Sequence, residues 1–346
     1  MKIHILHNLR EEPWGGGNQF LKALRGEWIR QGAYTDTSEE ADAILINSYP
    51  FSAEYLFDQL WHLKRRHPNK IVMYRLDGPI SFIRQKDQDF DRIIRAWSDA
   101  IADGIVFQSR WCEEQNRLAF GITSKYQTII HNAPDPNIFH DSTTQRLNDF
   151  PIKLIAASWS NNPRKGFDVY QFLDEHLDFN KYTMTFVGNA PVTFKHIKML
   201  APLPSNELAD VLRYHDIFIT ASKTDPCSNS LIEALACGLP SVALKDGGHP
   251  ELVQNGGELF ADTQDVLEKI DNVADHITDY QQQLPTMNLT QAANNYLAFV
   301  KQIWDDKQAG HYSPKRTRVG DLLTIKRMII TWKAKRLWNK STGSSN

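Results

Sequence analysis

The sequence has few cysteines and no pattern among them. There are three in 346 residues, Cys112, Cys227 and Cys237, and no pair has the spacing of a metal-binding motif. Three scattered thiols cannot form a disulfide framework or a structural zinc site. We therefore expect a protein of a reducing, cytoplasmic environment.

Long apolar runs are also missing. No run of about 18 apolar residues exists, so we expect no membrane-spanning helix. Residues 1–10 have neither the apolar centre nor the small-residue cleavage site of a signal peptide. The formal net charge is only −2, which by itself indicates no polyanionic partner.

The charge is distributed unevenly. Residues 311–346 hold nine Lys or Arg and one Asp, a net +8, so the rest carries −2 − 8 = −10. Within 315–341, Leu322, Ile325, Ile329 and Trp332 recur at helical spacing. Such a basic amphipathic helix fits either an anionic membrane surface or a helix packed on the body with a solvated basic face. Because the cations are confined to this terminal helix, we expect no nucleic-acid partner.

What the sequence does have is a regular alternation of apolar strands and amphipathic helices, which predicts parallel sheets covered on both faces. The predicted strands are 2–6, 42–48, 70–76, 103–109, 127–132, 152–159, 183–189, 216–222 and 241–245. A polar stretch, 133–151, reads as a linker. We predict an α/β protein of two doubly wound, Rossmann-like domains, divided as 1–140, 152–288, a closing helix 289–308 that crosses back to the first domain, and a basic helical tail 311–346.

One stretch, TDPCSNSLIEALACGLP, carries the strongest chemical signal. Ser228, Asn229 and Ser230 fall at the start of a predicted helix, where free backbone N–H groups attract an anion. Asp225 precedes them, and Glu233 lies one turn into the helix. Carboxylates on either side of an anion-binding helix N-terminus suit a ligand with both phosphate and hydroxyl groups, such as a nucleotide-sugar. The same residues also fit a capping Asp followed by a solvated helix Glu, so the stretch alone leaves both interpretations open.

Three weaker motifs follow other predicted strands. Arg164 and Lys165 open a helix in SNNPRKGFDVY, where cations suit a diphosphate leaving group. Gly16 and Gly17 in EEPWGGGNQF allow close backbone approach to a ligand, without the dinucleotide fingerprint. Asp77 in YRLDGP ends a strand of the first domain. Each motif also fits an ordinary surface turn.

Together these motifs resemble the retaining glycosyltransferases of family four, which have two facing Rossmann-like domains, the GT-B architecture. The family signature stands here as DPCSNSLIEALACGLP, with Asp225 and Glu233 in its two acidic places. FVGN, LAPLPSNEL and GGHPELV occur in the expected order in the second domain, and VFQSRW and IIHNAPDPNIF in the first. The resemblance covers about residues 1–308.

The resemblance implies a role for each matching residue. Glu233 would hold the donor ribose, Asp225 would contact the transferred sugar, and Lys165 would neutralise the diphosphate. Asp77, expected to be catalytic, stands where many members have a histidine that touches the sugar, and Ser160 stands where the family usually has an arginine, for which Arg164 would substitute. The implied donor site is completed by Gly16, Gly17, Gly188, Asn189, Leu203, Ser228, Asn229, Ser230 and Leu231.

We therefore expect a metal-independent retaining glycosyltransferase without a cofactor. It would move a hexose from a nucleoside-diphosphate sugar to a hydroxyl of a glycan or lipid-linked acceptor in polysaccharide biosynthesis. It would work in the cytoplasm, at the inner face of the membrane if the tail binds lipid. The alternatives are a nucleotide-sugar epimerase or hydrolase that uses Asp77 or His249, and a non-catalytic nucleotide-sugar binder. The donor base, sugar, acceptor and linkage are not fixed by the sequence.

Overall fold

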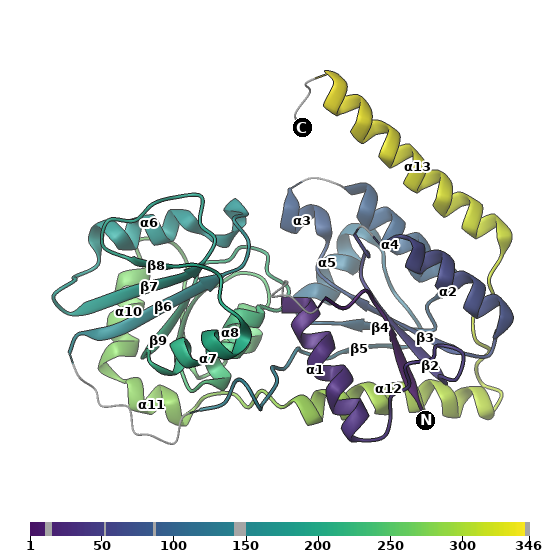
Figure 1. Cartoon of the computed structure of the whole chain (residues 1–346), viewed down its shortest axis with the longest axis horizontal. Helices are drawn as coiled ribbons and strands as arrows, with labels where there is room; N and C mark the ends of the chain where they lie inside the picture. Colours follow the sequence, from purple (N-terminus) through teal and green to yellow (C-terminus); the bar gives the residue numbers. More distant parts are fainter. Residues whose placement is uncertain (11–15, 52, 86–87, 142–149, 343–346) are drawn as a thin grey trace. The chain divides into compact units, whose positions relative to one another are not determined.

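A computed structural model describes the chain in two compact units (Figure 1). The described residues are 1–346 without 11–15, 52, 86–87, 142–149 and 343–346, and the side chains of 339–342 are also left aside. Part of the glycine-rich loop and part of the predicted linker thus lie outside the described residues. The first unit comprises 1–8, 25–130 and 293–346, and the second comprises 9–24 and 131–292.

The first unit contains a five-stranded parallel sheet whose spatial order follows the sequence. Its strands are β1 (Ile3–Leu6), β2 (Ala43–Asn47), β3 (Ile71–Leu76), β4 (Gly104–Phe107) and β5 (Gln127–Ile129). The first four strands are short and mainly apolar, and most of their residues are buried, as expected where helices cover both sides of a sheet, whereas no residue of the edge strand β5 is buried.

Helices flank this sheet and bury their apolar faces against it. In α4 (Gln88–Ile101), Ile93, Ile94, Trp97 and Ile101 recur at helical spacing and are all buried. The other helices with residues in the first unit are α1 (Gly16–Arg30), α2 (Tyr55–Arg66), α3 (Ile80–Arg84), α5 (Arg110–Phe120), α12 (Leu289–Gln308) and α13 (Val319–Thr342).

The second unit contains a six-stranded parallel sheet in the order β11-β10-β9-β6-β7-β8. The strand order reverses between β6 and β9, which creates a switch point where ligands bind beyond the carboxyl ends of such strands. The strands are β6 (Ile152–Ser158), β7 (Tyr182–Gly188), β8 (Lys198–Leu200), β9 (Ile217–Thr220), β10 (Ser241–Leu244) and β11 (Gly257–Phe260).

Alternate residues of the second sheet enter two separate core layers. Leu154 and Ala156 of β6 pack in one apolar cluster, whereas Ile155 between them packs in the other. Both faces are therefore covered by helices, namely α6 (Phe167–His176), α7 (Ser205–Arg213), α8 (Asn229–Ala236), α9 (His249–Val253), α10 (Val266–Asp275) and α11 (Ile277–Gln282). The short helix η1 (Pro163–Lys165), which has no buried residue, lies in the loop after β6.

The predicted fold class, α/β with two parallel sheets covered by helices, is confirmed. Two strands of the second sheet, β8 and β11, were not predicted. The unit boundaries also differ from the predicted ones, because the second unit begins at residue 131 and includes residues 9–24. Residues 293–346 lie in the first unit.

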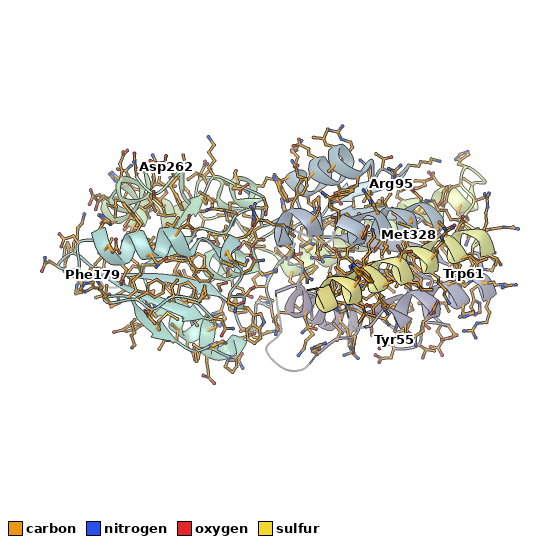
Figure 2. The ribbon with its side chains drawn as sticks, turned by 90° about the horizontal axis from the view of Figure 1, so that it is seen from above. Tyr55, Trp61, Arg95, Phe179, Asp262 and Met328 are labelled. Atoms are coloured by element: carbon orange, nitrogen blue, oxygen red, sulfur yellow. The ribbon has the colours of Figure 1, made fainter. Side chains whose placement is uncertain are left out.

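The basic tail forms α13, which packs on the first unit. Ile325 and Trp332 are buried in the core of that unit. In Figure 2, α13 crosses over α2 and α4, with Met328 labelled on it. The tail thus makes the body contact that was one of its two sequence-based interpretations. Within the described ranges, no helix has both the length and the apolar character needed to cross a membrane.

Candidate active site

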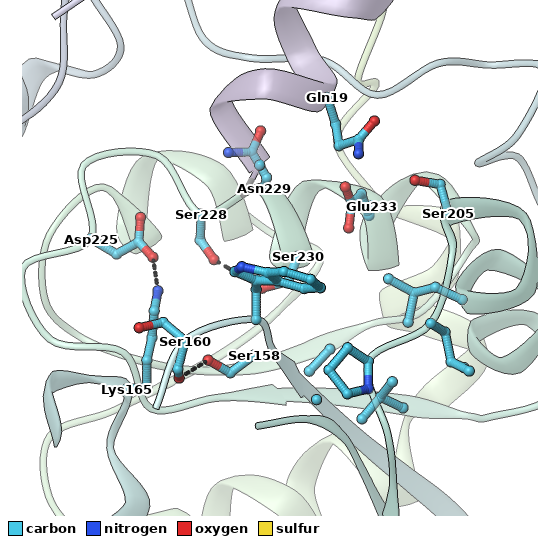
Figure 3. A pocket seen from close by; sticks show the side chains of 18 residues that line it. Gln19, Ser158, Ser160, Lys165, Ser205, Asp225, Ser228, Asn229, Ser230 and Glu233 are labelled. Atoms are coloured by element: carbon cyan, nitrogen blue, oxygen red, sulfur yellow. Dashed lines mark hydrogen bonds and ion pairs between the residues drawn. The ribbon is translucent and has the colours of Figure 1, made fainter. Parts of the chain in front are cut away.

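A pocket with a cavity volume of about 350 Å³ lies at the switch point of the second sheet. Loops that follow β6, β7, β8 and β9 meet there, because parallel strands end at one edge of the sheet. All its lining residues belong to the second unit, and Figure 3 shows them: Gly16, Gln19, Ala157, Ser158, Trp159, Ser160, Lys165, Val187, Gly188, Pro202, Leu203, Ser205, Leu208, Asp225, Ser228, Asn229, Ser230 and Glu233.

The N-terminus of α8 opens into this pocket. Ser228 is the N-cap residue, yet its side chain makes no capping hydrogen bond. Its hydroxyl instead lies 3.4 Å from the hydroxyl of Ser230. Asn229, also in the pocket lining, accepts a hydrogen bond of 3.1 Å from Asn132. The first amides of α8 are therefore available to an anion, as the sequence predicted for this helix start.

Lys165 and Asp225 form an ion pair at one side of the pocket. The Lys165 Nζ and Asp225 Oδ2 atoms are 3.0 Å apart, and Asp225 Oδ1 accepts from the Cys227 amide at 3.3 Å. Burial alone would raise the pKa of Asp225, but the charge and the hydrogen bond of Lys165 outweigh burial and lower that pKa. Asp225 is thus a carboxylate at neutral pH, held in place by a cation that also lines the pocket.

The loop after β10 holds the backbone of Asp225. The Gly248 amide donates to the Asp225 carbonyl at 2.9 Å. Gly247 has φ +62°, and a Cβ atom there would lie 2.3 Å from the same carbonyl oxygen. Thr224 has φ +52°, and its amide donates to Asp246 Oδ2 at 2.9 Å. The loop that contains the GGHPELV motif therefore fixes the backbone conformation of the loop that carries Asp225.

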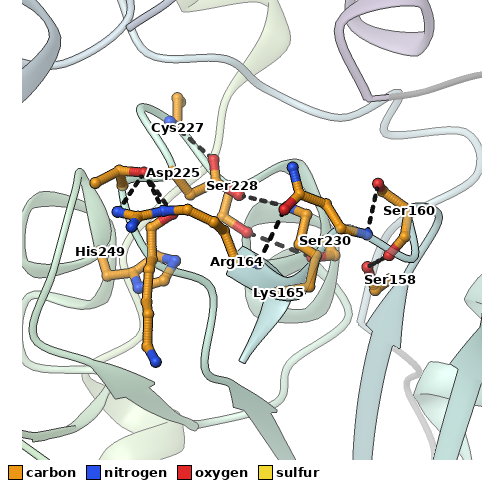
Figure 4. Close-up of polar contacts among 12 residues, drawn as sticks. Ser158, Ser160, Arg164, Lys165, Asp225, Cys227, Ser228, Ser230 and His249 are labelled. Carbon is orange, nitrogen blue, oxygen red and sulfur yellow. Dashed lines mark hydrogen bonds and ion pairs between the residues drawn. The ribbon is translucent and has the colours of Figure 1, made fainter. Parts of the chain in front are cut away.

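His249 lies beside Asp225 (Figure 4) and is fully buried. Its Nδ1 is 2.9 Å from the Leu244 carbonyl, and its Nε2 has no hydrogen-bond partner among the described residues. Burial lowers the pKa of His249, so the ring is neutral at pH 7. His249 is not among the pocket-lining residues, which weakens the alternative in which it activates a water or abstracts a proton from the sugar.

Glu233 lines the other side of the pocket. In Figure 3, Ser228 and Ser230 lie between it and the Lys165–Asp225 pair. The side chain is half-buried and, within the part of the chain that the structure describes, makes no hydrogen bond or ion pair. Burial raises its pKa to about 8. At neutral pH, Glu233 is therefore largely protonated and able to donate as well as accept.

The remaining wall of the pocket is apolar. It is formed by Val187, Pro202, Leu203 and Leu208, together with Trp159. Trp159 is 42% exposed. The backbone of Trp159 is fixed, because its carbonyl accepts from the Asn189 side chain at 2.7 Å. Sequence reasoning missed Trp159. The available signal was an aromatic residue placed directly at the carboxyl end of the first strand of the domain.

Arg164 was predicted in the donor site, but it is not among the pocket-lining residues. Its Nε and NH2 atoms donate to Thr224 Oγ1 at 3.2 and 3.0 Å, and its carbonyl accepts from the Lys223 amide at 2.7 Å. Arg164 therefore braces the loop that carries Asp225. Of the two predicted cations after β6, Arg164 and Lys165, only Lys165 lines the pocket.

The other predicted donor-site residues divide into two groups. Gly16, Gly188, Leu203, Ser228, Asn229 and Ser230 line the pocket with Lys165, Asp225 and Glu233. Gly17, Asn189 and Leu231 do not, and Leu231 is fully buried. Asn189 acts through the Trp159 backbone, as described above.

Asp77 lies in the first unit, at the carboxyl end of β3. Its Oδ1 is 3.5 Å from NH1 of Arg75, which is fully buried and also donates to Asn47. Gln108 donates to the same carboxylate, and the Asn116 side chain donates to the Asp77 carbonyl at 3.0 Å. Asp77 is therefore the counter-charge of a buried guanidinium, and its carboxylate is held by two neighbouring strands.

A metal centre is not evident among the described residues. No group of three or more His, Cys, Asp or Glu is placed there to hold an ion.

Comparison with known proteins finds a family match within the second unit. Residues 171–279 match the family model "Glycosyl transferases group 1". The chain is 32% identical over 187 residues to the phosphatidylinositol N-acetylglucosaminyltransferase GPI3 subunit of Saccharomyces cerevisiae (strain YJM789), covering 49% of this chain and 41% of that protein. Over 193 residues it is 24% identical to the corresponding gpi3 subunit of Schizosaccharomyces pombe, covering 51% and 41%. The match therefore spans about two fifths of the length of these relatives.

The likeness to solved structures covers more of the chain than the likeness to these relatives. Anabaena Alr3699/HepE in complex with UDP-glucose superposes with a TM-score of 0.64 at 16% identity, covering 89% of this chain and all of that one. The catalytic domain of starch synthase IV from Arabidopsis thaliana, bound to ADP and acarbose, gives 0.58 at 12% identity, with coverage of 85% and 79%. Residues 171–279 thus match the family model that the motifs of this segment predicted, and the likeness to the solved structures confirms the predicted GT-B fold.

Proposed function

We propose that the protein is a retaining glycosyltransferase that moves a hexose from a nucleoside-diphosphate sugar to an acceptor hydroxyl. One observation carries this proposal: the Lys165–Asp225 pair and Glu233 flank the uncapped N-terminus of α8 inside a single pocket. Asp225 would match the sugar, Lys165 and the amides of α8 would match the diphosphate, and Glu233 would match the ribose.

Each part of the donor has a matching part of the pocket. The diphosphate would lie on the amides of residues 229–231 and against Lys165, because both carry positive potential. The ribose hydroxyls would meet the largely protonated carboxyl group of Glu233, which can both donate and accept hydrogen bonds. The base would lie against the apolar wall that includes Trp159 and Leu203. Asp225 would then face the transferred sugar.

The reaction would proceed by substitution on one face of the sugar. The bond from the anomeric carbon to the diphosphate oxygen breaks, and a bond to the acceptor oxygen forms on the same face. The acceptor proton passes to the departing diphosphate oxygen. Lys165 and the α8 amides stabilise the charge that grows on the leaving group, and this is why we propose that neither a metal ion nor a cofactor is required.

The acceptor is proposed to be a glycan or a lipid-linked sugar. The curated relatives are named for transfer to phosphatidylinositol, which is a lipid. A lipid-linked acceptor would bring the enzyme to the cytoplasmic face of a membrane as a peripheral protein. Asp77, fixed at the edge of the first sheet by Arg75 and Gln108, is the side chain of that unit that we propose to contact the acceptor or the sugar.

The interpretation as an epimerase or hydrolase has less support, since His249 is enclosed and only Asp77 remains as its base. A non-catalytic binder would keep the pocket but transfer nothing. Incubation with UDP-, GDP- and ADP-hexoses and short-chain lipid-linked or glycan acceptors separates the three. We expect acceptor-dependent nucleotide release, a product with the donor's anomeric configuration by NMR, and no loss of rate with EDTA. Release without an acceptor, or an isomerised donor, would favour the alternatives.

A further inference from the structure

The inner face of α13 belongs to the core of the first unit. Ile325 and Trp332, seven residues apart, are both buried, and the Trp332 ring packs on Phe90 at 4.6 Å between centroids. Partly buried Leu322, Met328 and Ile329 extend this contact. The helix is therefore fixed to the body by one apolar stripe.

A second apolar stripe runs along the outer face of the same helix. Leu323, Ile330 and Leu337 are 62%, 66% and 69% exposed, and their seven-residue spacing aligns them on one side of an α-helix. Trp338, at 70% exposure, follows directly. An ordinary solvated face would carry polar residues at these positions, so this outer stripe needs another explanation.

Cations border the outer stripe. Lys326, Arg327 and Lys333 lie within one turn of Ile330, and all three are exposed. Only Lys326 of these has an acidic partner among the described residues, Asp58 at 2.9 Å. From 315 to 338 the sequence holds eight Lys or Arg and one Asp. The outer face of α13 is therefore both apolar and strongly positive.

We propose that this outer face docks on an anionic lipid surface while the inner face remains packed in the core. Leu323, Ile330, Leu337 and Trp338 would enter the boundary between headgroups and acyl chains, and the bordering cations would meet the anionic headgroups. The helix would not have to leave the body to do so. This docking would hold the first unit against a membrane, which goes beyond the proposed transfer reaction.

Charge favours lipid over the other occupants of such a stripe. A second copy would bring two strongly positive helices together, and like charges at close range oppose association. A nucleic acid would satisfy the cations but would leave three aligned aliphatic side chains without apolar contact. An anionic membrane surface satisfies both the apolar and the positive groups.

Substitution tests this better than deletion, because truncation would also remove Ile325 and Trp332 from the core. The test variant is Leu323→Gln with Ile330→Gln and Leu337→Gln. The matched controls are Ile29→Gln and Leu118→Gln, which change residues 53% and 68% exposed on other helices of the first unit. Each protein is sedimented with vesicles of phosphatidylcholine alone and of equal phosphatidylcholine and phosphatidylglycerol.

We expect the wild type and both controls to sediment with the mixed vesicles, less so in high salt and little with phosphatidylcholine alone. The triple variant should bind the mixed vesicles about tenfold more weakly. Its thermal stability and its affinity for a nucleoside diphosphate should be unchanged. If the triple variant unfolds, the charge reversal Arg327→Glu with Lys333→Glu gives the same expected loss without touching the stripe.

Three results would overturn the proposal. The wild type could fail to bind the mixed vesicles, or the triple variant could bind them as strongly as the wild type. Sedimentation velocity could also show a dimer that the triple substitution abolishes, which would assign the stripe to a second copy of the chain.

Discussion

At the residue scale, the site depends on two carboxyl groups whose charges are set by burial and by a neighbouring cation. Asp225 is kept ionised by Lys165, whereas burial protonates the carboxyl of Glu233. Two carboxyl groups in one pocket thus differ in protonation at neutral pH. Such a difference allows one to act as a charged contact and the other as a hydrogen-bond donor and acceptor for hydroxyls.

Glu233 gives a pH-dependent stability prediction. Its folded-state pKa of about 8 exceeds the ordinary value of 4.5, so the folded protein binds more protons than the unfolded chain between those values. Stability from this group is present at low pH and is lost as the pH rises from about 4.5 to about 8. Glu233→Gln removes this dependence. As the pH rises, the melting temperature of the variant should increase relative to that of the wild type. A difference in melting temperature that stays constant at all pH values would contradict the raised pKa of Glu233.

Trp159 gives a ligand prediction. If its exposed ring faces the donor base, Trp159→Ala should weaken nucleoside-diphosphate binding by about tenfold, the size of one lost stacking contact. Inorganic pyrophosphate has no base, so its binding should change little. Calorimetric titration of both ligands measures this. Equal losses for the two ligands, or no loss for either, would show that the ring does not contact the base.

The positions of the site residues were only partly predictable. Glu233, Asp225 and Ser228 could be placed from their spacing along one loop and helix, because local sequence fixes where a helix starts. Arg164 could not, because its direction is set by Thr224, which lies 60 residues away. The exposure of Trp159 likewise depends on strands that are distant in sequence.

At the element scale, the loop after β10 supports the loop after β9. Gly247→Ala would place a Cβ atom 2.3 Å from the Asp225 carbonyl at a residue with φ +62°. The backbone must then shift or strain. We expect weaker donor binding and a melting temperature lower by several degrees. Gly26→Ala, in the middle of α1 with no atom within 4 Å of the new Cβ, is the control and should be neutral or slightly stabilising. Equal behaviour of the two variants would exclude the support that we describe.

Among the strands of the second sheet, the mainly buried ones were predicted from the sequence and the half-exposed ones were not. β6 and β9 consist mainly of buried apolar residues, and they were predicted to within two residues. β8 has only three residues, none of them fully buried, and β11 has four residues of which only Phe260 is buried. Such short, half-exposed strands exist because the neighbouring strand offers hydrogen bonds, a cause that lies outside their own sequence.

At the scale of the whole molecule, the C-terminal segment is tied to the first unit through Asp103. Asp103 is fully buried and accepts from Lys64 Nζ at 2.7 Å. It also accepts from the hydroxyl of Tyr312 at 2.8 Å and from the Lys315 amide at 2.7 Å. The Val72 amide of β3 also donates to Asp103 at 2.8 Å, so one carboxylate connects α2, β3 and the segment that leads into α13.

Asp103→Ala should therefore be strongly destabilising. It would leave the ammonium of Lys64 buried without its counter-charge, which costs about 3–5 kcal/mol of folding free energy. The residues leading into α13 should also become sensitive to protease. Denaturant unfolding and limited proteolysis measure the two effects, and Asp99→Ala, at an exposed neighbouring position, is the control. A loss below about 1 kcal/mol, the range of surface pairs, would contradict this role.

The central claim is that the pocket at the switch point of the second sheet binds a nucleoside diphosphate through Lys165 and the start of α8. Calorimetric titration of wild type and Lys165→Ala with UDP, GDP and ADP tests it most directly, with Lys245→Ala as the control for an exposed lysine. We predict that at least one nucleotide binds the wild type and Lys245→Ala with equal affinity, and Lys165→Ala about a hundredfold more weakly. Binding of none of the three at millimolar concentration, or equal binding by Lys165→Ala, would contradict the account.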